Sequence, residues 1–136
     1  MYKTLKDGLI KRLFDYRDMC FNPYMRYMWI GGVRRFEDVP LSLMEDMVRI
    51  GFADPTDCQN SSPSIGDFIR FCRNHPETEF TFNGYLVART RDDTRISIEG
   101  MDTKQLNTDK ELVKDFLQDA DELSFNDDGS FHSWYD

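Results

Sequence analysis

The sequence has no long hydrophobic run, which argues against a chain that crosses a membrane as a helix. Its longest unbroken apolar stretches, residues 27–30 and 85–88, are far shorter than the roughly 20 residues that such a helix needs. Charged side chains between residues 6 and 12 interrupt any apolar segment near the start, so we expect no export signal. We therefore predict a cytoplasmic protein that has no membrane partner.

Cysteine and histidine are also scarce, with three and two residues among 136. Cys20, Cys58 and Cys72 form no disulfide framework, and we expect free, buried thiols in a reducing compartment. Cys72 and His75 are three residues apart, so they could share a helical face as a thiolate–imidazole pair. Zinc would also need Cys58 and His132, whose spacing fits no known zinc site. We predict no metal and no cofactor, with a metal-binding or enzymatic domain using Cys72 and His75 as an alternative.

Loops that bind phosphate or calcium are missing as well. No Lys-Ser or Lys-Thr pair follows any glycine to form a phosphate-binding loop. A calcium loop counted from Gly129 would begin at Ser124 and end at Tyr135, and neither residue supplies a carboxylate. The adjacent carboxylates at 92–93 and 127–128 fall where we expect turns. Because these loops and any clear set of catalytic residues are missing, we predict that the protein is not an enzyme.

What the first half does contain is helical spacing of apolar residues. The first predicted helix begins with a capping box at Thr4 and ends before Pro23. Its apolar stripe comprises Leu5, Leu9, Ile10, Leu13, Phe14 and Tyr16. A second helix is predicted from a capping box at Ser42 to Ile50, where Gly51 suits a left-handed cap. Residues 24–30 fit either a short helix or an extended segment, and residues 53–63 form a polar loop.

A third helix is predicted from Ser64 to Asn74, and after it the apolar period changes from about 3.6 to 2. The inward face of this helix comprises Ile65, Phe68, Ile69 and Cys72. Asn83–Gly84 predicts a two-residue hairpin turn, and Asp92–Asp93 predicts a second turn. These turns give a three-stranded meander with Val87 opposite Ile98. Its apolar face would comprise Phe80, Phe82, Tyr85, Val87, Ile96 and Ile98.

The last third predicts one more helix and a hairpin. A capping box at Thr108 opens the helix, which runs to about Ala120. A short loop containing Gly129 then sets Phe125 opposite Phe131. The fold class is therefore α+β: a helical N-terminal half, and an antiparallel sheet of meander plus C-terminal hairpin with a helix on one face. We predict a single domain over residues 1–136, with a helical part at 1–76 and a sheet-plus-helix part at 77–136.

Negative charge is in excess and unevenly placed. The net charge is -8, and residues 101–136 carry three basic and ten acidic side chains. On the predicted helix, Glu111, Asp115, Asp119 and Glu122 recur at helical spacing and would form an acidic ridge. Like charges at this spacing cost a few tenths of a kcal/mol per pair, so the ridge suggests a function. A solvated helix face is the plain alternative.

These features predict a non-enzymatic, acidic protein-binding module. We expect an inhibitor or decoy that presents the ridge to a basic surface of another protein, in the way that proteins imitating nucleic acid do. Direct binding of nucleic acid is not expected from an acidic chain. The alternative is an accessory protein that binds nucleic acid through Arg34 and Arg35, which stand among Tyr27, Trp29 and Phe36.

Overall fold

The computed structural model describes the backbone of residues 2–136 and the side chains from Gly8 onward, and its fold is α+β, as predicted. A four-stranded antiparallel sheet has the order β1-β2-β3-β4, and a separate hairpin pairs β5 with β6. The elements in chain order are α1 (Tyr2–Phe21), a 3-10 turn (Asn22–Tyr24), β1 (Met25–Ile30), β2 (Val33–Pro40), α2 (Leu41–Ile50), α3 (Ile65–Asn74), β3 (Thr81–Val87), β4 (Ile96–Asp102), α4 (Lys110–Phe116), β5 (Glu122–Phe125) and β6 (Phe131–Trp134).

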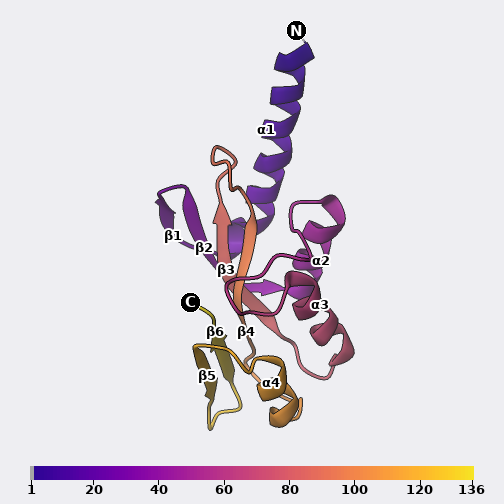
Figure 1. Cartoon of the computed structure of the whole chain (residues 1–136), viewed down its shortest axis with the longest axis vertical. Helices are drawn as coiled ribbons and strands as arrows, with labels where there is room; N and C mark the ends of the chain where they lie inside the picture. The colour runs from indigo at the N-terminus through magenta and orange to yellow at the C-terminus, as the bar shows by residue number, and fades with distance from the viewer. Residues whose placement is uncertain (1) are drawn as a thin grey trace.

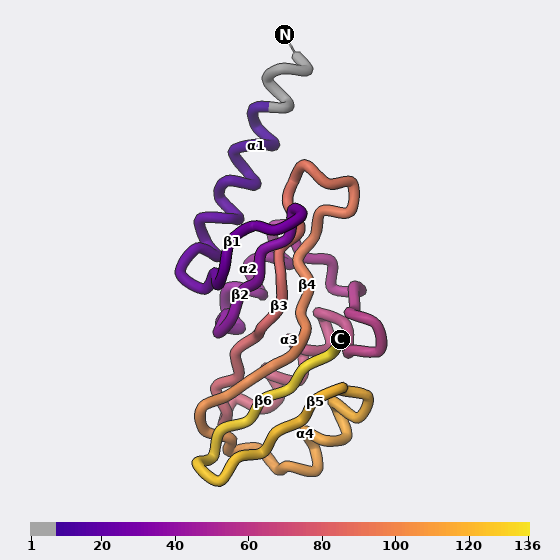
Figure 2. The backbone as a smooth tube through the Cα atoms, turned by 90° about the vertical axis from the view of Figure 1, so that its left-hand side faces the viewer, coloured from indigo at the N-terminus to yellow at the C-terminus, as the bar shows by residue number. Residues whose placement is uncertain are grey.

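The arrangement is elongated (Figure 1). The sheet lies in the middle, and α1 extends beyond one end of it. The helices α2 and α3 cover one face, while α4 and the β5–β6 hairpin lie at the opposite end from the tip of α1, as the rotated view also shows (Figure 2). None of the helices in residues 2–136 combines the length and the apolar character required for a membrane span.

The helix α1 confirms the first predicted helix, but its apolar stripe is not core. Leu9, Leu13 and Tyr16 are 54%, 45% and 46% exposed. The last turns attach α1 to the body, with the buried Phe21 packing on the Phe36 ring at 5.1 Å. The α-helix ends at Phe21, as predicted, but the chain stays helical up to Pro23, because a 3-10 turn over Asn22–Tyr24 follows directly. The capping box at Thr4 and the side chain of Leu5 lie outside the described side chains.

The helices α2 and α3 confirm two further predictions, with one correction. Ser64 caps α3 by accepting a hydrogen bond from the Asp67 amide, and Gly51 ends α2 at a φ of 98°. Ser42 is not a cap, because α2 already begins at Leu41, after Pro40. The inward face of α3 is buried as predicted, and the edge of the Phe68 ring contacts the sheet.

The first half also contributes two strands. Residues 25–30 are extended and pair with β2 through a turn in which Gly31 and Gly32 have φ values of 61° and 78°. These left-handed values favour glycine at both positions. Arg34 and Arg35 therefore lie on strand β2, and the nearby Trp29 is 37% exposed.

The turn predicted at Asn83–Gly84 is wrong, because both residues lie inside β3. Gly84 is needed there for close approach: a Cβ atom would collide with the Ser97 carbonyl and the Phe36 ring. A bulge at this point shifts the pairing, so that Gly84 rather than Val87 faces Ile98. The connection through residues 88–95 agrees with the second predicted turn.

The same correction changes which side chains face the core. Leu86, which is not part of the predicted apolar face, is fully buried in the core cluster. Tyr85 was expected in the core but is only half-buried, and its hydroxyl donates to Gln59 Oε1 while accepting from Arg95. Because residues 83 and 84 continue the strand, Phe82 and Leu86 lie on the same face of the sheet. A turn at these two residues would place them on opposite faces.

The C-terminal hairpin is confirmed, with Phe125 opposite Phe131 and Gly129 at a φ of 90°. It lies along β4 and is joined to it by an isolated bridge between Thr103 and Phe131, by the Tyr135 amide donating to the Glu99 carbonyl, and by the Ser133 hydroxyl, which bonds both backbone groups of Met101. The helix before it is shorter than predicted. It begins after Asp109, whose side chain accepts from the Glu111 amide, and it ends at Phe116.

Candidate functional site

The C-terminal end of the molecule collects exposed carboxylates, which we call the acidic end. Residues 103–136 carry nine acidic and three basic side chains, and every one of the nine acids is exposed. These acids are Asp109, Glu111, Asp115, Asp119, Asp121, Glu122, Asp127, Asp128 and Asp136. They come from α4, the hairpin and the segments that adjoin them. The helix α4 and the hairpin lie at the lower end of the molecule in Figure 1, and the C-terminal Asp136 lies above them.

The four residues predicted to form one ridge do not share one helix. Glu111 and Asp115 lie on α4, Asp119 lies in the turn that follows, and Glu122 begins β5. The helix stops because the chain turns toward the hairpin, with Leu117 fully buried at its end. The acidic end is therefore a cluster drawn from several elements rather than a helical stripe.

Basic side chains neutralise only part of this cluster. The Lys114 amine lies 3.5 Å from Glu111, and it also lies 5.6 Å above the Phe125 ring. The ring of His132 approaches Glu122 at 3.9 Å. Within residues 8–136, no ion pair joins Asp115 or Asp119 to a lysine or arginine.

The acids of this cluster also differ in their local roles. Asp109 caps α4, and Asp128 accepts hydrogen bonds from the amide and hydroxyl of Ser130, which lower the pKa of its carboxyl. Asp121 accepts from the amide of Asp136. Asp115 and Asp119 make no such contact among the described residues, so their charges face solvent.

The pKa of Tyr135 is affected by the negative charges of this region. Its ring is buried, and burial together with the charges of Asp119 and Asp121 raises its pKa to about 12. Burial has the larger effect, and the two carboxylates act in the same direction because they oppose a second negative charge. The neutral phenol is the form that this end of the molecule favours.

Cys72 and His75 do not form a catalytic pair. Cys72 is buried, and burial, with a smaller contribution from the charge of Glu45, raises its pKa to about 12. A thiol with this pKa remains protonated at neutral pH and is a poor nucleophile. The ring of His75 instead packs on Phe71 at 4.4 Å, and its Nδ1 atom lies 3.3 Å from Glu77.

A zinc site is not assembled either. In the part of the chain that the structure describes, no three histidine, cysteine or acidic side chains come together as metal ligands would. Cys58 is exposed and Cys72 is buried, so the proposed ligands differ in environment as well as in position. The arginine pair is also occupied: Arg34 donates to the Tyr27 carbonyl, and Arg35 forms an ion pair with Glu99.

One constellation escaped sequence reasoning. The Nδ1 atom of His132 lies 2.8 Å from Asp102, which also accepts from Asn83 and from the Ser133 amide. Burial raises the pKa of Asp102, while the charge of His132 opposes that shift. Asp102 borders a cavity of about 670 Å³. Because β4 and β6 are joined by some thirty residues, no local motif could have revealed this contact.

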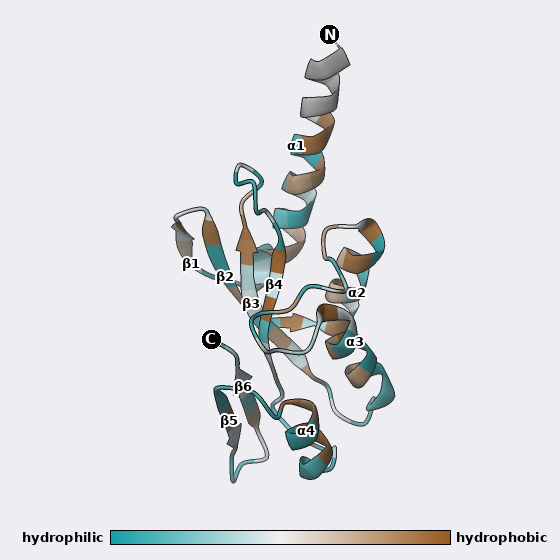
Figure 3. Ribbon diagram, in the orientation of Figure 1, coloured by the Kyte–Doolittle hydropathy of each residue, from teal (hydrophilic) through white to brown (hydrophobic). Residues whose placement is uncertain are grey.

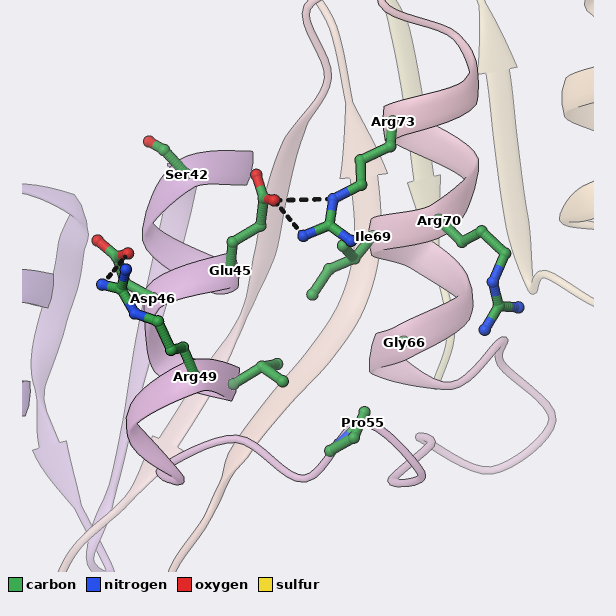
Figure 4. Close-up of a pocket in the computed structure, with 10 residues that line it drawn as sticks. Ser42, Glu45, Asp46, Arg49, Pro55, Gly66, Ile69, Arg70 and Arg73 are labelled. Carbon is green, nitrogen blue, oxygen red and sulfur yellow. Dashed lines mark hydrogen bonds and ion pairs between the residues drawn. The ribbon is translucent and has the colours of Figure 1, made fainter.

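A second cavity, of about 630 Å³, lies between α2 and α3 (Figure 4). Arg49, Arg70 and Arg73 line it, which at first suggests a site for an anion. Each guanidinium is already paired with a neighbouring carboxylate, however, and Figure 4 draws two of these pairs. The partners are Asp46, Asp67 and Glu45. The cavity therefore offers no surplus positive charge.

Comparison with known proteins gives no match among family models, curated proteins or solved structures. The arginines that line the second cavity are paired, whereas several carboxylates of the acidic end are not. The acidic end also contains the four residues that the sequence predicts as an acidic ridge.

Proposed function

We propose that the protein is a non-enzymatic binding module, an inhibitor or decoy, that presents its acidic end to a basic surface of a partner protein. The observation that carries this proposal is the collection of exposed carboxylates at one end, with Asp115 and Asp119 unpaired among the described residues. A basic surface that binds phosphates would be attracted by the same charges.

The separation of charge along the molecule supports this proposal. Residues 1–36 carry eight basic and three acidic side chains, whereas residues 103–136 carry three and nine. The second segment lies at one end of the long axis, and α1, which belongs to the first segment, extends beyond the opposite end (Figure 1). A field of this kind attracts a basic partner from a distance and orients it toward the acidic end before contact.

The packing beneath the acidic end supports it as well. Val113 and Leu117 are fully buried, and Tyr135 is 1% exposed. These side chains fix the backbone segments that carry the carboxylates, so little conformational entropy is lost when a partner binds. Three free cysteines in the described chain suit a partner in the reducing cytoplasm.

The test is affinity capture from the lysate of the native host, with the immobilised chain of residues 1–136. Reversing two charges, Asp115→Lys with Asp119→Lys, should lower the recovery of captured protein at least tenfold. The matched control is Asp92→Lys with Glu37→Lys, which changes the net charge equally at two exposed carboxylates outside the acidic end. Double-stranded DNA added to the lysate should release the same captured protein if the acidic end imitates nucleic acid.

Circular dichroism should show that both double variants fold like the parent. Equal recovery by the parent and by the Asp115→Lys, Asp119→Lys variant would refute the proposal. Equal losses in the two variants would also refute it, because they would trace binding to net charge rather than to the acidic end.

A further inference from the structure

The interface between β6 and β4 combines apolar, backbone and charged contacts. Figure 3 shows brown, hydrophobic segments in β3 and β4, and the buried Phe131 of β6 belongs to the same core cluster. The side chain of His132, next along β6, points to Asp102 on β4 instead, with its Nδ1 atom 2.8 Å from a carboxylate oxygen. Within residues 8–136, this is the one ion pair that joins the hairpin to the four-stranded sheet.

Asp102 is a carboxylate that three strands share. Besides His132, it accepts hydrogen bonds from the Asn83 side chain on β3 and from the Ser133 amide on β6. Its side chain is 25% exposed, and burial raises its pKa, while the charge of His132 opposes that shift. No lysine or arginine of residues 8–136 forms an ion pair with it. The partly buried charge of Asp102 therefore depends on His132 for a counter-charge.

The imidazole ring of His132 lies near carboxylates of two other strands. Asp102 faces its Nδ1 atom, and the more exposed Glu122 on β5 lies 3.9 Å from its Nε2 atom. Five further charged side chains lie on β4 or line the cavity beside Asp102, and in the described chain none of them forms an ion pair with His132 or Asp102. They are Asp38, Glu77, Glu79, Glu99 and Lys104.

We propose that the charge of His132 controls how firmly the hairpin is held against β4, which makes this interface sensitive to pH. Histidine is the side chain whose charge changes between about pH 5 and pH 8. The protonated ring donates a hydrogen bond to Asp102 and also supplies the positive charge that the carboxylate needs. The neutral ring keeps at most the hydrogen bond, so the charge of Asp102 loses its compensation as the pH rises.

The titration of Asp102 acts in the same direction. Because its pKa is raised in the folded chain, its contribution to stability is complete below the ordinary aspartate pKa. That contribution is lost as the pH rises through the folded value. Both groups therefore favour a hairpin that is held most firmly in mildly acidic solution and loosens as the pH rises.

The biological role of this contact rests on the proposed function. Residues 122–136 carry four of the nine carboxylates of the acidic end: Glu122, Asp127, Asp128 and Asp136. A loosened hairpin must be ordered again when a partner binds, and that ordering costs affinity. The charge of His132 would then regulate how well the acidic end is prepared for binding.

Amide hydrogen exchange of the 136-residue chain, followed by NMR at pH 6 and pH 8, measures the contact directly. Protection factors remove the intrinsic pH dependence of exchange, and the amides of α2 serve as the internal reference. We expect the protection of β6 relative to α2 to fall roughly threefold from pH 6 to pH 8, as for the loss of a partly exposed ion pair.

His132→Gln should abolish this fall, because glutamine donates a hydrogen bond but does not titrate. Asp102→Asn should abolish it too, because the amide carries no charge. His75→Gln is the matched control: it replaces the other histidine, which faces Glu77 at the end of α3, and it should keep the fall of the parent. Glu99 titrates in every one of these chains, so the comparison removes its contribution.

Equal relative protection of β6 at pH 6 and pH 8 in the parent would overturn the proposal without any variant. A fall of the parent's size in His132→Gln or in Asp102→Asn would overturn it as well, because the pH dependence would then come from other groups. The exchange measurement needs no partner protein, whereas the capture experiment does. Either proposal can therefore fail while the other stands.

Discussion

At the scale of single residues, burial rather than identity decides what the titratable groups can do. Glu99 is 5% exposed, and although Arg35 and Trp134 both contact its carboxylate, burial outweighs them and raises its pKa. Cys72 follows the same rule and remains a thiol. The local sequence does not predict these two pKa shifts, because they depend on strands and helices that meet only in the folded chain.

The raised pKa of Glu99 predicts how stability changes with pH. The folded state binds this proton more tightly than the unfolded state, so its contribution to the free energy of unfolding is complete below the ordinary glutamate pKa. It is lost as the pH rises through the folded value. Glu99→Gln removes this dependence, so the urea midpoint of the variant should gain on that of the parent between pH 4 and pH 7. A difference independent of pH would contradict the assignment.

At the scale of elements, prediction succeeded where a signal was local and failed where it depended on a neighbour. The cap at Ser64, the left-handed Gly51 and the Phe125–Phe131 pair are set by nearby residues and were found. The Asn83–Gly84 pair has strong turn chemistry, yet β2 and β4 flank it on both sides and hold it in a strand. Residues 24–30 fit either a helix or a strand for the same reason, because pairing with β2 is what makes β1 a strand.

Close approach of β6 to β4 gives a prediction at this scale. Gly100 lies so near the Ser133 carbonyl that a Cβ atom would collide with it. Gly100→Ala should therefore lower the free energy of unfolding by on the order of 2 kcal/mol, by pushing the hairpin away from β4. Urea denaturation measures the loss. Gly8→Ala, at a helical position with open space, is the control and should not destabilise. Equal stability of Gly100→Ala and the parent would rule out this contact.

At the scale of the whole molecule, charge is unevenly distributed along the long axis. The sequence predicts this uneven distribution better than it predicts how the acidic residues are arranged. The acidic excess of the last third was evident from composition. The sequence did not reveal that α4 stops at Phe116, so that Asp119 and Glu122 leave the helix. The four predicted residues still lie at one end of the fold, because the hairpin after α4 stays beside it (Figure 2).

Crowded like charges should cost stability, and this predicts an effect of neutralisation. Asp115→Asn with Asp119→Asn should raise the melting temperature of the full chain at low ionic strength, because repulsion within the acidic end falls. The gain should shrink in 1 M salt, where the screening length is about 3 Å. Differential scanning calorimetry at both salt concentrations is the measurement. A gain of the same size at both would mean that the two carboxylates do not repel their neighbours.

The hydrogen bond from Arg17 to Val87 spans 70 positions of the chain, and β2 finds its partner β3 only after α2 and α3. Ribosomes add about 5–20 residues per second, so several seconds separate the emergence of α1 from that of its anchor. During that interval the nascent chain exposes the apolar side chains of α1 and the unpaired edge of β2. Synthesis order therefore leaves α1 without its anchor until β3 has been made.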